Sequence, residues 1–302
     1  MSVPDHSRTT GPSHQERADS LETLTHVLLA LGPYRPDLIL IGGWVPFLYQ
    51  RFGGFPEWQV EIARTVELDM FVPSPLAAAD RPSLADILHE AGFETTPGNG
   101  GAFWIRKGAT DEMIEFFTVH HGTARQLGRP HEISGQTALA GIALQHLSLL
   151  TDDTRTLEIE PDTGHGSLTV RVPTLGGYVL NKALTFIERL SVREEGILKA
   201  AKDVVYIRDV MAGGEAVRAQ VRSDITVLVN RNKSRQNLVK TARNRLHRLT
   251  TGPGSVLEAA VRQLAVQHRF RSEDAAKADL IGYLEILSVI LDESGRGRRR
   301  GK

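Results

Sequence analysis

The spacing of hydrophobic residues predicts a chain that mixes helices with strands in its first half and is helical in its second. From about Ala18, leucine and valine recur every three or four positions up to Leu31, which is the repeat of an amphipathic helix. Short hydrophobic runs bounded by glycine or proline then predict strands at 38–41, 66–72, 102–106, 112–119, 156–160 and 167–172. Further helices are expected at 44–50 and 84–91.

The pattern changes after Pro173, where helical spacing dominates and strand signals become few. Helices are predicted at 179–190, at 196–211 and over most of 215–291. We therefore expect four parts: a disordered leader at 1–17, an α/β domain at 18–172, a helical domain at 173–294 and a basic disordered tail at 295–302.

Composition narrows the class of protein. The chain has 302 residues, of which 41% are hydrophobic, and this length is typical of two domains. It contains no cysteine, so disulfides and thiolate metal sites are excluded and a metal would need oxygen or imidazole ligands. No hydrophobic run is long enough to span a bilayer and the N-terminal residues are polar, so we expect a cytoplasmic protein without a membrane partner.

The predicted strand at 66–72 carries two acids at a spacing that matters chemically. Side chains alternate along a strand, so Glu67 and Asp69 point to one side while Leu68 and Met70 point to the core. Two carboxylates so placed can share a divalent cation, which phosphoryl and nucleotidyl transfer require. The alternative is an exposed polar face on an edge strand.

A third acid and a glycine pair are candidates for the same site. Glu115 interrupts a hydrophobic strand and is the best third carboxylate, although Asp111 and Glu112 lie nearby. Gly42 and Gly43 lie between a strand and a helix, where backbone amides could approach a triphosphate, although an ordinary tight turn explains them equally well.

Two stretches resemble the nucleotidyltransferase superfamily. The residues 39–43 (ILIGG) and 64–71 (RTVELDMF) are similar to its glycine pair and its paired-acid strand. Pro173, Lys182, Ala183, Arg189 and the pair Lys202, Asp203 resemble the helical region of the abortive-infection (AbiEii-like) nucleotidyltransferase toxins and their uncharacterised relatives. The likeness covers about half of the chain, from Leu38 to Met211.

The resemblance implies a nucleotidyltransferase-type mixed sheet with flanking helices, followed by a helical C-terminal domain. It also implies transfer of a nucleoside monophosphate from a nucleoside triphosphate to an acceptor hydroxyl, with Mg²⁺ or Mn²⁺ on Glu67, Asp69 and Glu115. Gly42 and Gly43 would then line the phosphates, and Lys182 would act on the leaving pyrophosphate. The remaining phosphate-binding candidates are Arg189 and Lys202, for which a solvated basic stripe and a role in helix packing are the respective alternatives.

The sequence departs from the superfamily pattern at its first acid. That acid is usually aspartate, and Glu67 adds a methylene group. The alternative function is therefore a catalytically inactive member of the fold that binds nucleic acid or a protein partner.

Basic residues concentrate in one stretch although the whole chain is neutral, with 36 basic and 36 acidic residues. Between Arg218 and Arg248 arginine and lysine are frequent and Asp224 is the one acid. Such helices favour an RNA acceptor such as tRNA, although a solvated helix face is an equal alternative and there is no aromatic residue for base stacking. The toxin resemblance adds an antitoxin-type protein as a predicted partner.

Overall fold

The computed structural model describes residues 14–62, 67–77, 80–96, 101–106, 113–119, 128–160, 166–191, 193–252, 254–268 and 270–295. The chain divides into two compact units. The sheet unit comprises Gln15–Phe55 and Arg64–Asn181, and the helical unit contains Pro56–Ala63 and Lys182–Lys302. The predicted boundary after Val172 falls near the end of a strand, whereas the division between the two units falls between Asn181 and Lys182, inside the following helix.

The main sheet of the sheet unit is mixed, as predicted. Its central path runs β1 (Ile39–Ile41), β2 (Glu67–Phe71), β5 (Met113–Val119), β4 (Phe103–Arg106) and β3 (Phe93–Thr95). β7 (Ala140–Leu144) also pairs with β5, and β6 (Pro130–Glu132) pairs with β7. The β2–β5 and β5–β7 pairs are parallel, and the other pairs in this sheet are antiparallel.

A second, two-stranded sheet is formed by β8 (Thr154–Ile159) and β9 (Leu168–Pro173), which pair antiparallel as the sequence predicts. β9 lies beside β1. The Tyr49 hydroxyl donates a hydrogen bond of 2.9 Å to the Pro173 carbonyl oxygen, which ties α2 (Trp44–Phe52) to the end of β9.

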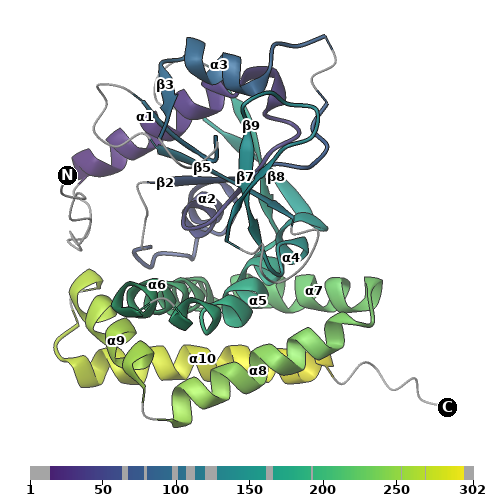
Figure 1. The fold of residues 1–302 in the computed structure, drawn as a ribbon. Coiled ribbons are helices and arrows are strands. Elements are labelled where there is room, and N and C mark those ends of the chain that lie inside the picture. The colour runs from purple at the N-terminus through teal and green to yellow at the C-terminus, as the bar shows by residue number, and fades with distance from the viewer. Residues whose placement is uncertain are drawn as a thin grey trace. The chain divides into compact units, whose positions relative to one another are not determined.

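Helices and strands alternate from α1 to β3 in the sheet unit, and β3 to β7 then follow one another among the described residues (Figure 1). α1 (His14–Ala30) precedes β1 and begins inside the segment that the sequence predicts to be a disordered leader. α3 (Leu84–Glu90) follows β2 and contacts β3, and the Ser83 hydroxyl accepts a hydrogen bond from the Asp86 amide at its N-terminus. The short helix α4 (Ser148–Thr151) precedes β8.

The three strands that the sequence did not predict have weak strand signals. β3 and β6 are three residues long and expose two of their side chains, and β7 is rich in alanine and glycine. Alternation of buried and exposed residues is too short to detect in such segments. These strands form because each has a partner strand beside it, not because of local propensity.

The helical unit consists of long helices packed against one another. α5 (Leu175–Thr185) carries the chain into this unit, and η3 (Glu188–Ser191) follows it. The remaining helices are α6 (Arg193–Met211), α7 (Glu215–Arg231), α8 (Arg235–Thr251), α9 (Ser255–Gln267) and α10 (Glu273–Gly295). α6 packs against α9, and α10 contacts α6, α7, α8 and α9. The predicted helical character of this half is confirmed.

No helix among the described residues is long and hydrophobic enough to cross a membrane.

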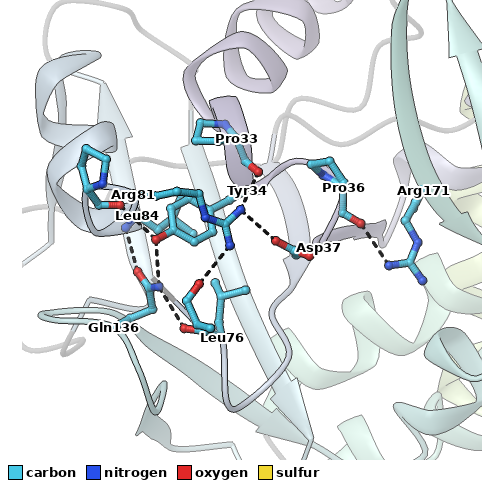
Figure 2. Close-up of polar contacts among 11 residues, drawn as sticks. Pro33, Tyr34, Pro36, Asp37, Leu76, Arg81, Leu84, Gln136 and Arg171 are labelled. Atoms are coloured by element: carbon cyan, nitrogen blue, oxygen red, sulfur yellow. Dashed lines mark hydrogen bonds and ion pairs between the residues drawn. The ribbon is translucent and has the colours of Figure 1, made fainter. Parts of the chain in front are cut away.

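A polar network in the sheet unit joins three segments that are distant in sequence (Figure 2). The Arg81 guanidinium lies 4.0 Å from the centre of the Tyr34 ring and donates to the Pro33 and Ala77 carbonyl oxygens and to Asp37. Gln136 donates to the Tyr34 hydroxyl over 3.1 Å and to the Leu76 carbonyl oxygen over 3.0 Å. The network thereby holds the connection between β2 and α3.

Arg81→Lys should destabilise the sheet unit although it keeps the positive charge. Lysine lacks the planar fork that reaches three acceptors and stacks on a ring, so we expect a loss of about 1–2 kcal/mol in the free energy of unfolding. Urea denaturation measures this loss. Arg51→Lys, at an exposed arginine of α2, is the matched control, and an equal effect of both changes would contradict the role given to Arg81.

Candidate active site

The paired acids lie on one face of the main sheet. Along β2, Leu68 and Met70 are fully buried while Glu67 and Asp69 are half-buried. β5 shows the same alternation, with Ile114 buried and Glu115 half-buried. The side chains of the described strands therefore separate into a closed face without these acids and a more accessible face that bears them.

Strand register brings two of the acids together. β2 and β5 are parallel neighbours, and Asp69 lies directly opposite Glu115. Partner residues in a parallel pair point to the same side, and adjacent strands are about 4.8 Å apart. Glu67 lies opposite Met113, one step further along the same face. The structure thus places the third predicted acid beside Asp69, which the sequence alone could only suggest.

The predicted glycine pair lies beside these acids. β1 pairs with β2 so that Ile41 lies opposite Asp69, and Gly42 follows Ile41 directly. Gly42 has φ +73°, and a β-carbon on it would lie 1.8 Å from Asp69 Oδ2. Glycine is therefore required at position 42 for two reasons. Its backbone conformation favours glycine, and the Asp69 carboxylate occupies the space that a side chain would need.

The N-terminus of α2 follows this turn. Gly43 is its N-cap residue, no side chain caps the helix, and its first turn contains no acid. Backbone amides at such a helix end, together with the helix dipole, favour an anion. This position fits the phosphate-binding role that the sequence predicts for Gly42 and Gly43.

The acids fit a cation that is shared with a substrate. No group of three or more His, Asp or Glu side chains within the described residues is arranged to hold a metal ion by itself. Mg²⁺ usually takes one or two carboxylates and completes its shell with water and substrate phosphates. Asp69 and Glu115, in register and half-buried, match that requirement in ligand type and placement.

The predicted phosphate-binding residues Lys182 and Arg189 lie in the helical unit, where both bind one carboxylate. Lys182 Nζ and Arg189 Nε each lie 2.6 Å from an oxygen of Asp203, on α6. The Lys182 ammonium also lies 5.5 Å from the centre of the Tyr206 ring. Asp203 is 3% exposed, Lys182 9% and Arg189 38%, so the cluster reaches solvent through Arg189. Lys202 precedes Asp203 and is half-buried.

Charge around Asp203 decides its protonation. Burial by itself raises the pKa of this carboxyl group, but the charges of Lys182 and Arg189 and their hydrogen bonds outweigh burial and hold the pKa below its ordinary value. Asp203 is therefore ionised at neutral pH. The sequence did not identify it as the common partner of Lys182 and Arg189, because that pairing depends on how α5, η3 and α6 pack.

Acids pair with much of the predicted basic stretch, one from the same helix and the others from η3 and α10. The ion pairs are Arg218–Glu215, Arg222–Glu293, Arg243–Asp292 and Arg245–Glu188. Arg235 is buried. Lys233, Lys240 and Arg248 are exposed. The charge of this stretch in the folded protein is thus smaller than its sequence suggests.

Comparison with known families assigns the chain to one of them. A family model described as a nucleotidyltransferase matches residues 20–224. The protein belongs to this nucleotidyltransferase family. No curated protein and no solved structure matches significantly. Family membership confirms the superfamily and the fold class and indicates that the protein is a transferase acting in nucleotidyl transfer on a nucleoside triphosphate. The narrower likeness to abortive-infection toxins stays a prediction.

Gly42→Ala should destabilise this nucleotidyltransferase more than Gly54→Ala does. Both glycines have positive φ, +73° and +81°, so alanine costs about 1–2 kcal/mol at each from backbone strain. A β-carbon on Gly54 meets nothing within 4 Å, whereas one on Gly42 collides with Asp69. Urea denaturation should show the larger loss for Gly42→Ala, and equal losses would mean that the carboxylate moves aside freely.

Asp203→Asn should cost about 3 kcal/mol at pH 7, because it leaves the buried Lys182 ammonium without its counter-charge. The pKa of Asp203 is lowered by folding, so its stabilising contribution is complete above the unfolded pKa of about 4 and is lost as pH falls through the folded value. The stability difference between wild type and variant should stay constant from about pH 7 to 5 and shrink below about pH 4.

Chemical denaturation at several pH values measures this difference. Asp80→Asn, at an exposed aspartate between β2 and α3, is the control and should show little effect at any pH. A difference between wild type and Asp203→Asn that grows on acidification would contradict the assigned ion pairs.

Proposed function

We propose that this protein transfers a nucleoside monophosphate from a nucleoside triphosphate to an acceptor hydroxyl in a reaction that depends on Mg²⁺ or Mn²⁺. The observation that carries the proposal is the juxtaposition of Asp69 with Glu115 across β2 and β5 and with Gly42 across β1 and β2. It joins two carboxylates and a glycine turn before a helix N-terminus, which are the parts that this chemistry needs.

In this proposal Glu67 and Asp69 hold the cation, with Glu115 completing the set. The cation, when bound, neutralises phosphate charge and lowers the pKa of the attacking hydroxyl. The acceptor oxygen forms a bond to the α-phosphorus, the bond from that phosphorus to pyrophosphate breaks, and Glu115 accepts the proton of the hydroxyl. Gly42 and Gly43 bind phosphate oxygens through backbone amides.

Lys182, Arg189 and Lys202 are the proposed phosphate-binding cations of the helical unit, and Lys182 acts on the leaving pyrophosphate. Lys182 Nζ donates a hydrogen bond of 2.6 Å to Asp203 Oδ1. Asp203 would then keep Lys182 and Arg189 side by side. Its own charge reduces that of the cluster to about one net positive charge, which suits a phosphate.

RNA, with tRNA as one example, is the proposed acceptor class, and the exposed Lys233, Lys240 and Arg248 support it. An antitoxin-type protein partner and a cytoplasmic location belong to the same proposal and rest on the sequence. The alternative is an inactive member that binds nucleic acid or protein, and Glu67 in place of an aspartate favours it.

Asp69→Asn should abolish transfer without unfolding the protein, because the amide lacks the charge that holds a divalent cation. The test is incubation of the purified protein with each labelled nucleoside triphosphate, Mg²⁺ or Mn²⁺, and total cellular RNA. Wild type is compared with Asp69→Asn and with the double variant Glu67→Ala, Asp69→Ala. Glu132→Gln, at an exposed acid of β6, is the matched control and should retain full activity.

Label in RNA from wild type and Glu132→Gln alone would support both the reaction and the acceptor. Full activity of Asp69→Asn would exclude the proposed site. Binding of RNA that weakens steeply with salt, with no consumption of triphosphate, would favour the inactive alternative.

A further inference from the structure

Hydrophobic side chains lie on the acidic face of the main sheet, the face that bears the predicted acids. β4 pairs antiparallel with β5, so that Phe103 lies opposite Glu115 and Ile105 lies opposite Met113. Directly opposed residues of neighbouring strands point to the same side of a sheet. Phe103 and Ile105 therefore project from the acidic face, whereas Trp104, between them, is fully buried on the other face.

These hydrophobic side chains are accessible, unlike others on the same face. Ile105 is 39% exposed, and Phe103 and Met113 are half-buried. Two residues further along β2 and β5, Phe71 and Phe117 belong to the same face and are only 7% and 9% exposed. The accessible hydrophobic side chains are thus the ones beside the acids. We call Phe103, Ile105 and Met113 the platform.

The platform and the glycine turn lie on opposite sides of the acids. The strands follow one another in the order β1, β2, β5 and β4. The successive partners in one row across these strands are Ile41, Asp69, Glu115 and Phe103. Gly42 follows Ile41 at one end of this row, and Phe103 is the other end. Adjacent strands are about 4.8 Å apart, so the backbone at Phe103 lies about 5 Å from that at Glu115 and about 10 Å from that at Asp69.

This order determines where an acceptor approaches in the proposed reaction. The phosphates are proposed to lie on Gly42 and Gly43, on the β1 side of the acids. In phosphoryl transfer the attacking and leaving oxygens lie roughly in line through the phosphorus. Departure of pyrophosphate toward the glycine turn therefore brings the acceptor hydroxyl in from the β5 side. Glu115, the proposed acceptor of its proton, lies on that side, and Phe103 is its neighbour.

A hydrophobic surface beside carboxylates favours one part of a nucleic-acid acceptor. Phosphate groups carry the same charge as the acids and are repelled by them, whereas a nucleobase is planar and uncharged. Bases stack on aromatic side chains, and such stacking tolerates different bases because each of them has a π-face. The sugar that carries the attacking hydroxyl also carries a base, so both groups can lie over neighbouring strands.

We infer that the platform binds the base of the nucleoside that carries the attacking hydroxyl, with Phe103 stacked on that base. The acceptor is then the end of a nucleic-acid strand and not the hydroxyl of a protein side chain. The role as acceptor rests on the proposed function, whereas binding of a terminal base does not. All residues that carry the inference lie in the sheet unit.

The test measures binding of two labelled oligonucleotides to the full-length protein by fluorescence anisotropy. Both are short oligoadenylates with a free terminal hydroxyl, and the second lacks the base of its last nucleotide. Wild type is compared with Phe103→Ala and Phe103→Leu, which lack the ring, and with Phe103→Tyr, which keeps it. Phe52→Ala, at a half-buried phenylalanine at the end of α2, is the matched control.

We expect wild type, Phe103→Tyr and Phe52→Ala to bind the complete oligonucleotide about tenfold more tightly than the one without its last base. Phe103→Ala and Phe103→Leu should bind both equally, because loss of the ring and loss of the base remove the same contact. Partial unfolding would weaken binding of both oligonucleotides and leave their ratio unchanged. A wild type that binds both equally or binds neither would overturn the inference, as would a preference that persists in Phe103→Ala.

Activity separates this inference from the proposed function. If wild type transfers label to the oligoadenylate, Phe103→Ala should raise KM for the oligonucleotide about tenfold, with little change in kcat or in KM for the triphosphate. A rise in KM for the triphosphate alone would overturn the inference, because the platform would then bind the base of the triphosphate.

Two further outcomes distinguish the two hypotheses. Discrimination between the oligonucleotides without any transfer by wild type would support the platform and count against the proposed reaction. Transfer by wild type with an unchanged KM for the oligonucleotide in Phe103→Ala would support the reaction and overturn the inference.

Discussion

Parallel pairing of β2 with β5 is the constraint on which the sheet unit depends. The pair is central in the main sheet, with β1 on one side and β4 and β7 on the other. The register places Leu68 opposite Ile114 and Asp69 opposite Glu115. The same register therefore determines both which side chains form the buried face and which form the acidic face. A slip of one residue would turn the acids into the core and expose the hydrophobic side chains, and the cost of that exchange enforces the register.

Packing on the closed face of the sheet fixes the positions of the carboxylates on the acidic face. Leu68, Met70, Ile114 and Trp104 are at most 1% exposed, and they hold the strands firmly enough for carboxylates to stand side by side on the other face. Two neighbouring carboxylates repel one another unless a positive charge or a hydrogen-bond donor compensates. In the proposed reaction, a divalent cation bound with a nucleotide would supply such compensation.

In the helical unit the like charges are positive. Lys182 and Arg189 would repel one another if Asp203 did not bind both. Asp203 accepts hydrogen bonds from Lys182 and Arg189 in a largely buried setting, and its ionisation depends on them. The basic stretch shows the same principle at the surface, where Glu188, Asp292 and Glu293 pair with arginines of α7 and α8. The net charge of a stretch of sequence therefore does not predict the electrostatic field around the folded protein.

The sequence by itself determined the class of fold, most helices and strands, and the residues Glu67, Asp69, Gly42 and Gly43 as candidates, because periodicity and residue type are local properties. It predicted Glu115 from its hydrophobic surroundings, but only strand pairing placed it opposite Asp69. β3, β6 and β7 escaped prediction because their pairing depends on partners distant in sequence. Only the tertiary structure decided that Gly42 contacts Asp69, that Lys182 and Arg189 bind the same Asp203, and that Gly213 contacts Trp58. Each of these contacts joins residues that are separated along the chain, and sequence separation does not predict distance in space.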